Sequence, residues 1–249
     1  MSSSANNNPL HIGIVACSAE GAALCYRTIC AEGAHWLGPH AHPEISMHTH
    51  SFSGYVACID HDDWKAVGEL MLSSANKLAK IGADFVICPD NTIHQALCHI
   101  KHVLPLPWLH IAQVVAARAK ELGYERLGLT GTRWLVESDV YPTALEEHGL
   151  SYVRPGKEER DEINRIIMDE LVLGIFKQEA VEYFQGVMSR LKDQGCGAVV
   201  LGCTEIPLIM NDRNSPIPTL DSTRLLARAA LQRAIAGQGL QTTESKMQV

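Results

Sequence analysis

The stretch VVLGCTEIPL, Val199–Leu208, decides the fold and points to a site within it. Val199, Val200 and Leu201 form an apolar run that is typical of a strand covered on both faces of a parallel sheet. Cys203 follows almost directly after this run. In open α/β sheets, ligands bind just outside the carboxyl ends of the strands. We therefore expect Cys203 to lie in a functional site.

Strand-like and helix-like segments alternate along the chain. Short apolar runs at 11–15, 85–88 and 127–130 are each followed by a turn and a segment with helical spacing. The clearest helix is 64–81, where apolar residues recur every three or four positions after a capping aspartate. Further helices are predicted at 20–31, 111–122, 136–148, 161–173, 178–194 and 222–236, the last capped by Ser222. This alternation predicts an α/β fold with mostly parallel sheets and helices on both faces.

The two halves of the chain repeat each other. IGIV at 12–15 resembles LGLT at 127–130, and FVICPDNT at 85–92 resembles AVVLGCTE at 198–205. The two offsets, 115 and 113 residues, nearly agree. The chain thus consists of two copies of one βα unit, each with a polar loop after a buried strand. A pseudo-twofold axis between them would bring Asp90 and Cys203 to opposite sides of one cleft.

This repeat predicts two lobes. The N-terminal lobe comprises residues 9–107 together with 219–240, and the C-terminal lobe comprises residues 108–218. Pro105–Pro107 suits a linker between the copies. The polar ends, residues 1–8 and 241–249, are predicted to be flexible tails.

Composition narrows the possible partners and the compartment. The net charge is −7 with no basic run, which argues against nucleic acid and anionic membranes as partners. No apolar stretch approaches the ~18 residues that a membrane span requires, and the first residues do not form a signal peptide. The eight cysteines include no Cys-x-x-Cys pair, so we expect reduced thiols and a cytoplasmic location.

The loops that carry Asp90 and Cys203 resemble the signatures of the aspartate/glutamate racemase superfamily, the cofactor-independent racemases. The resemblance extends over residues 11–236. It rests on the following motifs: NTIH at 91–94, LPWLHI at 106–111, LGLTGTRW at 127–134, ERDEINRIIMDEL at 159–171, GCTEIPL at 202–208 and PTLDST at 218–223.

This resemblance implies two pseudo-symmetric Rossmann-like lobes with the active site between them, and a homodimer. It also implies two opposed acid/base groups, one from each lobe, that exchange the α-proton of a small acidic amino acid without cofactor or metal. Two-cysteine members carry Cys-Asn-Thr in the first motif, where this chain has Asp90-Asn91-Thr92. The expected catalytic residues are therefore Cys203 and Asp90.

The replacement of a thiol by a carboxyl group leaves three outcomes open. A thiolate is a good base near neutral pH, whereas an ordinary aspartate, with a pKa of ~3.9, is a weak one. Burial beside a thiolate would raise the pKa of Asp90. The chain could racemise its substrate with one direction favoured. It could instead protonate one face only, as arylmalonate decarboxylase does with a single cysteine, or it could bind a small acid without catalysis.

Polar loop residues at matching positions are expected to bind the substrate. Ser18 suits a substrate carboxylate and also suits an N-cap. Glu205 could orient a neighbour, bind the substrate ammonium or serve as a first-turn helix carboxylate. Asn and Thr at the other positions are also common in strand-to-helix turns. The predicted substrate-binding residues are Ser18, Asn91, Thr92, Thr132, Thr204 and Glu205.

Many members of the superfamily hold a side-chain carboxylate with an arginine after the second strand. Residues 44–50 contain no arginine here, and His48 or His50 is the available substitute. The histidines between 35 and 50 lack the spacing of a metal site, so they are interpreted as loop residues. Cys17 and Cys88 are interpreted as buried packing residues.

Overall fold

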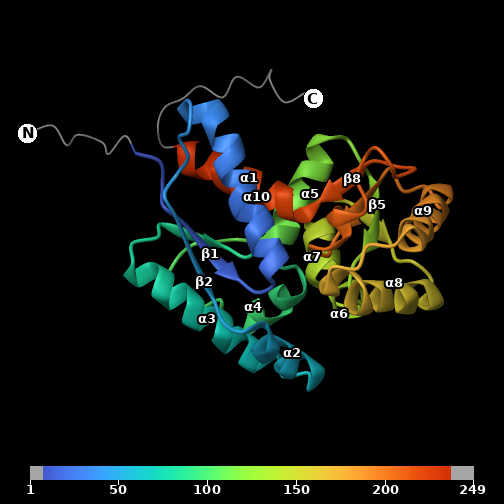
Figure 1. Ribbon diagram of the computed structural model, residues 1–249, viewed down its shortest axis with the longest axis horizontal. Helices are drawn as coiled ribbons and strands as arrows, with labels where there is room; N and C mark the ends of the chain where they lie inside the picture. The colour runs from blue at the N-terminus through green and yellow to red at the C-terminus, as the bar shows by residue number, and fades with distance from the viewer. Residues whose placement is uncertain (1–7, 237–249) are drawn as a thin grey trace, which may run out of the picture.

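The computed structural model describes residues 8–236, and the predicted tails lie outside them apart from Asn8. The described strands form two four-stranded sheets in which all neighbours are parallel. Their order is β2-β1-β3-β4 in one sheet and β6-β5-β7-β8 in the other (Figure 1). The strands are β1 (Ile12–Ala16), β2 (Ile45–Thr49), β3 (Phe85–Ile87), β4 (Trp108–Leu109), β5 (Arg126–Thr130), β6 (Ser151–Val153), β7 (Ala198–Leu201) and β8 (Thr219–Asp221).

The identical strand order confirms the internal repeat. Ile12 of β1 pairs with Phe85 of β3, and Leu127 of β5 pairs with Ala198 of β7. The equivalent strands therefore keep the offsets seen in the sequence, including the register of pairing. The predicted fold class, an α/β protein with two similar parallel-sheet lobes, is confirmed.

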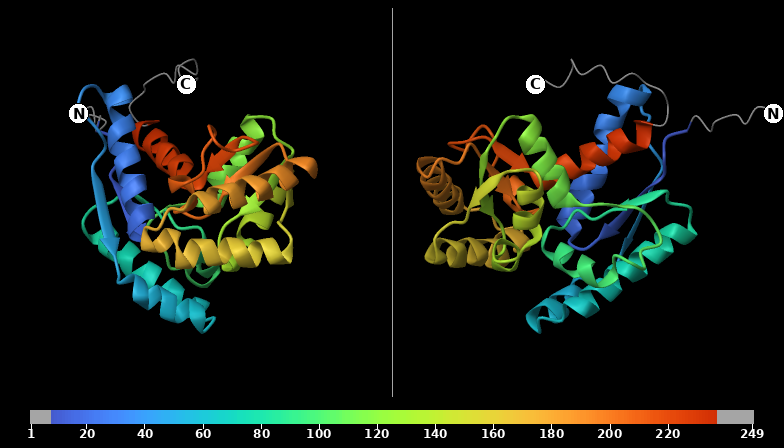
Figure 2. Two further views of the ribbon diagram at one scale, coloured as in Figure 1. Left: turned by 45° about the vertical axis from the view of Figure 1, so that its right-hand side comes forward. Right: turned by 180° about the vertical axis from the view of Figure 1, so that it is seen from behind.

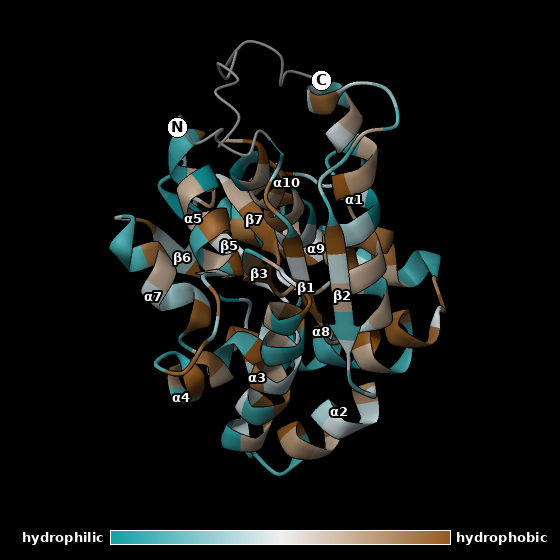
Figure 3. Cartoon of the chain, turned by 90° about the vertical axis from the view of Figure 1, so that its left-hand side faces the viewer, coloured by the Kyte–Doolittle hydropathy of each residue, from teal (hydrophilic) through white to brown (hydrophobic). Residues whose placement is uncertain are grey.

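The central strands are apolar because helices cover both of their faces. Every residue of β1, β3 and β7 is buried. The edge strand β2 is only partly buried, and its colour in Figure 3 changes from hydrophobic at one end to hydrophilic at the other. Parallel strands pair here through long helical crossovers, which provide the covering layers.

The longer helices surround the two sheets, and short helices follow some of the strands. They are α1 (Ala19–Leu37), α2 (Phe52–Asp60), α3 (Trp64–Lys80), η1 (Thr92–Ala96), α4 (Leu97–Ile100), α5 (Ile111–Glu121), α6 (Arg133–Val136), α7 (Val140–Glu147), α8 (Lys157–Asp169), η2 (Leu171–Leu173), α9 (Gln178–Asp193), η3 (Ile206–Leu208) and α10 (Ser222–Ile235).

Helices α5 and α10 connect the two lobes. α10 follows the second sheet but lies beside α1 of the first lobe (Figures 1 and 2), where Leu226 packs in one core with Ile12. α5 follows the first sheet and contributes Val115 to the core around Leu127 of the second. Strand β4 pairs with β3 and so belongs to the first sheet, whereas β8 pairs with β7 and belongs to the second. The lobe boundaries drawn from the sequence stay a prediction.

Several helix predictions need correction. Residues 52–60 form α2, which was not predicted. The predicted helix 136–148 is α7, which begins only at Val140 and ends at Glu147, while Val136 is the last residue of α6. The Ser138 hydroxyl donates to the Leu135 carbonyl and accepts from the Val140 N–H, which closes a turn between the two helices. The predicted helix 161–173 begins at Lys157 and ends at Asp169. Asp221, and not Ser222, caps α10 by accepting from the Arg224 N–H.

Candidate active site

Asp90 and Cys203 line one pocket between the two lobes. Asp90 follows β3 and Cys203 follows β7, which are equivalent strands of the repeat. The residues that follow the carboxyl ends of both strands therefore meet at one pocket, which is where open α/β sheets bind ligands. The six predicted substrate-binding residues line the same pocket: Ser18, Asn91, Thr92, Thr132, Thr204 and Glu205.

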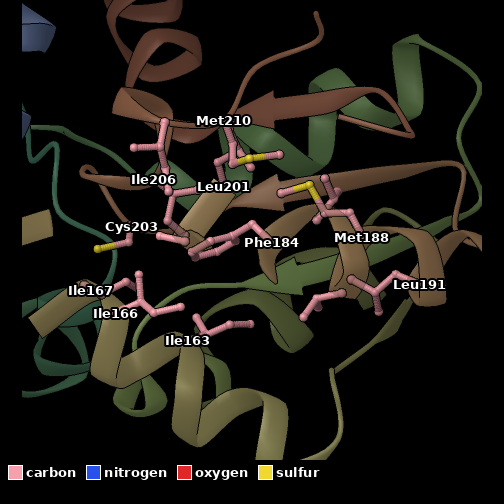
Figure 4. Packing of buried hydrophobic residues seen from close by; sticks show 14 of the residues in the cluster. Ile163, Ile166, Ile167, Phe184, Met188, Leu191, Leu201, Cys203, Ile206 and Met210 are labelled. Atoms are coloured by element: carbon pink, nitrogen blue, oxygen red, sulfur yellow. The ribbon is translucent and has the colours of Figure 1, made fainter. Parts of the chain in front are cut away.

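Cys203 is held as a hydrogen-bond donor. Its Sγ lies 2.9 Å from Glu205 Oε2, and the Thr204 hydroxyl donates to the same oxygen at 2.7 Å. Burial, followed by the charge of Glu205, raises the pKa of the Cys203 thiol well above its usual value. Figure 4 shows the sulfur pointing away from the apolar cluster that contains Leu201 and Ile206. The resting group is therefore a thiol that faces the pocket.

Asp90 lies in a tight turn that fixes its carboxyl group. Its Oδ1 accepts the Ile93 N–H at 3.1 Å, and its carbonyl accepts from His94 Nδ1 at 2.6 Å. Burial raises the pKa of Asp90 to about 6, and the charge of Glu205 also raises it, while the hydrogen bond from Ile93 opposes the shift. An acid with this pKa exchanges protons readily near neutral pH.

Two hydroxyl pairs cross between the lobes in equivalent positions. Ser18 Oγ lies 3.3 Å from Thr204 Oγ1, and Thr92 Oγ1 lies 3.0 Å from Thr132 Oγ1. In each pair, one hydroxyl follows the first strand of one lobe and the other follows the third strand of the other lobe. Ser18 and Thr132 also cap helices by accepting the N–H groups of Gly21 and Leu135. Both interpretations of Ser18, pocket residue and N-cap, therefore describe its position.

Asn91 differs from the other predicted residues because both polar atoms of its amide bond to side chains that do not line the pocket. Its Nδ2 donates to Ser222 Oγ at 2.9 Å, and its Oδ1 accepts from the Tyr141 hydroxyl at 2.7 Å. Asn91 is 2% exposed. These contacts join the first-lobe loop to α7 and to the start of α10.

Cys17 packs in a buried cluster with Tyr55 and Val67 of neighbouring helices, as predicted, and it also lines the pocket. It directly follows β1, is buried, and lines the pocket beside Asp90. Burial and the charge of Asp90 raise its pKa. The sequence does contain a signal for this pocket position, because Cys17 directly precedes Ser18 in the loop after the first strand.

The outer walls of the pocket come from two helices. Phe52, Val56 and Ile59 of α2 lie on one side, and Ile167 and Met168 of α8 lie on the other. The first three were missed because residues 52–60 carry no clear helical pattern in the sequence. The α8 residues belong to a predicted helix, but nothing in the sequence relates that helix to the loops.

His48 and His50, the suggested substitutes for the missing arginine, do not line the pocket. His48 contacts Ser74 and Lys77, and His50 contacts Ser73, so both side chains pack β2 against α3. Within residues 8–236, no group of three or more His, Cys, Asp or Glu side chains could hold a metal ion. No helix in that range is long and apolar enough to cross a bilayer.

A pocket between two repeated α/β lobes, with one titratable side chain at each equivalent strand end, is typical of α/β enzymes that act on small molecules held between their lobes. The chain belongs to the Asp/Glu/hydantoin racemase family, whose model matches residues 14–230.

Individual relatives agree with this assignment. The broad specificity amino-acid racemase RacX of Bacillus subtilis (strain 168) is 26% identical over 185 residues, which cover 72% of this chain and 76% of RacX. The structure of a Yersinia pestis protein assigned to the Asp/Glu racemases superposes with a TM-score of 0.84 at 31% identity, covering 91% of this chain and 99% of that one. An aspartate racemase homologue from Pyrococcus horikoshii OT3 superposes with a TM-score of 0.78 at 26% identity, covering 90% and 98%.

Proposed function

We propose that the protein is an amino-acid racemase that works without pyridoxal phosphate, other cofactors or metal, and that Cys203 and Asp90 exchange the α-proton. The observation that carries this proposal is that the two side chains occupy equivalent positions of the repeat and line one pocket. Inversion of a stereocentre requires a base on one face of the carbon and an acid on the other. Two groups that face each other across a pseudo-twofold axis meet that requirement.

The proton positions favour one direction of the first step. Near neutral pH the Asp90 carboxyl, with a pKa of about 6, is largely ionised, while Cys203 holds its proton. Asp90 takes the α-proton, the electron pair stays on the α-carbon, and Cys203 then donates its proton to the opposite face. The products are the other enantiomer, a Cys203 thiolate and a protonated Asp90. Proton exchange with water or the reverse reaction restores the resting state.

The remaining pocket residues would hold the substrate. The α1 helix begins at Ala19, so the Ser18 hydroxyl and the N-terminal end of this helix suit the α-carboxylate. Thr92, Thr132 and Thr204 offer hydroxyl groups on both sides. The buried Glu205 carboxylate would bind the α-ammonium. Asn91, which is already bonded, would contribute by fixing the Asp90 loop.

Exchange in heavy water tests this proposal. A panel of L- and D-amino acids is incubated with the protein, and deuterium at the α-carbon and chirality are followed by NMR and chiral chromatography. We expect both enantiomers of at least one amino acid to exchange, and Cys203→Ser to reduce the rate by at least about a thousandfold. The matched control is Cys98→Ser, since Cys98 is exposed and lies outside the pocket.

Other outcomes distinguish the alternatives. Release of carbon dioxide from a malonate, without racemisation, would identify single-face protonation by Cys203. Tight binding of one acid with no exchange would identify a binding protein. Either result contradicts the racemase proposal.

We also propose that the protein is a homodimer in the cytoplasm. The segment around η2 exposes several large apolar side chains, among them Leu173 at 67% and Phe176 at 56%, which supports a covered surface. The eight cysteines are all unpaired within residues 8–236, which suits a reducing compartment. Light scattering coupled to size-exclusion chromatography tests the dimer, and a monomer at micromolar concentration would contradict it.

A further inference from the structure

All the charged side chains that line the pocket are acidic. They are Asp90 and Glu205 at the strand ends and Asp60 at the end of α2. Among the described residues, no lysine, arginine or histidine lines this pocket. A substrate with a side-chain carboxylate would bring a further negative charge to this site, with no cation to bind it.

Three basic side chains lie close in sequence to pocket-lining residues, but none of the three lines the pocket itself. Arg133 follows Thr132, but its side chain is exposed and does not line the pocket. Its guanidinium lies 4.7 Å from the ring centre of Trp134, which does line the pocket. Lys177 and Arg165 both pair with the Glu170 carboxylate, at 3.2 and 2.8 Å.

The space beyond the reacting groups is apolar. Its walls are Phe52, Val56 and Ile59 of α2 and Ile167, Met168 and Val172 at the end of α8 and in η2. Asp60 follows Ile59 directly and is exposed, so a carboxylate lies at the outer end of the α2 wall. A side chain that extends from the reacting carbon along this wall would meet apolar groups first and a negative charge last.

We infer that the substrate is an amino acid with a long apolar side chain, preferably one that ends in a cation, and not an acidic amino acid. This inference rests on the proposed racemase function. It departs from the acidic substrate that the sequence resemblance implies. Methylene groups gain from burial against the α2 and α8 walls. A terminal ammonium or guanidinium would lie at Asp60, whereas a terminal carboxylate would lose hydration and be repelled by the acidic groups.

The test compares substrates of similar length that differ in their end group. L-Glutamate, L-methionine, L-norleucine and L-lysine are incubated with the protein in heavy water, and kcat/KM for α-deuterium exchange is measured for each. We expect norleucine, methionine and lysine each to exceed glutamate at least tenfold. We also expect lysine to exceed norleucine.

Two substitutions examine the walls. In Asp60→Asn, the ratio of the lysine rate to the norleucine rate should fall at least threefold. The control is Glu69→Gln, which removes an exposed carboxylate from α3 outside this pocket and should leave that ratio unchanged. Val56→Arg supplies the missing cation, so the ratio of the glutamate rate to the lysine rate should rise at least tenfold.

The outcomes separate this inference from the function on which it rests. If none of the four exchanges and no amino acid of the wider panel exchanges either, the racemase proposal fails. If glutamate exchanges fastest of the four in the unchanged protein, the racemase proposal holds and the inference about the side chain is overturned. Loss of that glutamate activity in Arg133→Ala would then identify Arg133 as the cation that binds it.

Discussion

The Cys203 thiol donates a hydrogen bond to the Glu205 carboxylate across 2.9 Å, and both residues lie in the same loop after β7. Glu205 accepts from Thr204 with the same oxygen and is 5% exposed. The candidate acid of the second lobe is thus kept protonated by its burial and, in addition, by the negative charge of Glu205. On the first lobe, Asp90 has a pKa of about 6 and is largely ionised at neutral pH, so the two walls of the pocket differ in protonation state.

Removal of the Glu205 charge should lower the pKa of the Cys203 thiol. In Glu205→Gln, the amide keeps an oxygen that can accept from the thiol, but the charge that opposes the thiolate is gone. We expect the pH midpoint for alkylation of Cys203 by iodoacetamide to move to lower pH, with a rate at pH 8 at least about threefold higher. Peptide mass spectrometry separates Cys203 from Cys17. A midpoint that does not move, or that rises, would contradict this electrostatic account.

The raised pKa of Asp90 predicts a pH-dependent loss of stability. Its carboxyl pKa rises from an ordinary 3.8 to about 6, so the folded state binds more protons than the unfolded state between these values. Stability from this group therefore falls as pH rises from about 4 to about 6, and the full penalty remains at higher pH. Asp90→Asn should be more stable than the unchanged protein above pH 6, by at most about 3 kcal/mol. Below pH 4 the difference should vanish.

Urea unfolding at a series of pH values measures this effect. The control is Asp193→Asn, because Asp193 is exposed at the end of α9. A constant difference between Asp90→Asn and the unchanged protein from pH 4 to pH 8 would show that Asp90 has an ordinary pKa.

The buried Asn91 should matter for stability more than Asn76, an exposed asparagine of the same lobe. In Asn91→Ala, the Tyr141 hydroxyl and one contact of Ser222 lose a buried partner. Unpaired buried polar groups cost about 1–3 kcal/mol each, so we expect a loss of roughly 2–4 kcal/mol in the free energy of unfolding. Asn76→Ala on the exposed face of α3 should change it by less than about 0.5 kcal/mol. Equal effects of the two substitutions would refute the buried linkage.

Gly21 of α1 has no room for a side chain, because the loops that carry Asp90 and Cys203 approach it closely. An added Cβ would lie 2.6 Å from the Pro89 carbonyl oxygen and 2.6 Å from Thr204 Cγ2, so Gly21→Ala must displace loops of both lobes. We expect it to destabilise the protein by about 1–3 kcal/mol and to lower kcat/KM at least tenfold. Gly54→Ala in α2 meets only Leu70 Cδ1 at 3.9 Å and should stabilise the helix by roughly 0.5 kcal/mol. Thermal unfolding and α-proton exchange, measured on both variants, test this contrast.

Much of the site follows from the position of residues relative to buried strands. The apolar runs identify β1, β3, β5 and β7, and the residues just past them include Ser18, Asp90, Thr132 and Cys203. Cys17 was assigned to packing because a thiol in an apolar context has no periodic signal that separates a core residue from a pocket residue. Helix α2 was missed for a related reason, since its short sequence FSGYVACID mixes apolar residues with glycine and serine.

The sequence by itself determined the α/β class, the two-fold repeat and the loops that carry Asp90 and Cys203. These features follow from local hydrophobic patterns and from the order of similar segments along the chain. Only the tertiary structure decided that α2 and α8 wall the pocket, that His48 and His50 stay outside it, and that Asn91 is bonded to Tyr141 and Ser222. These contacts join residues 26 to 131 positions apart. Their existence depends on how the lobes and helices pack, which no local pattern records.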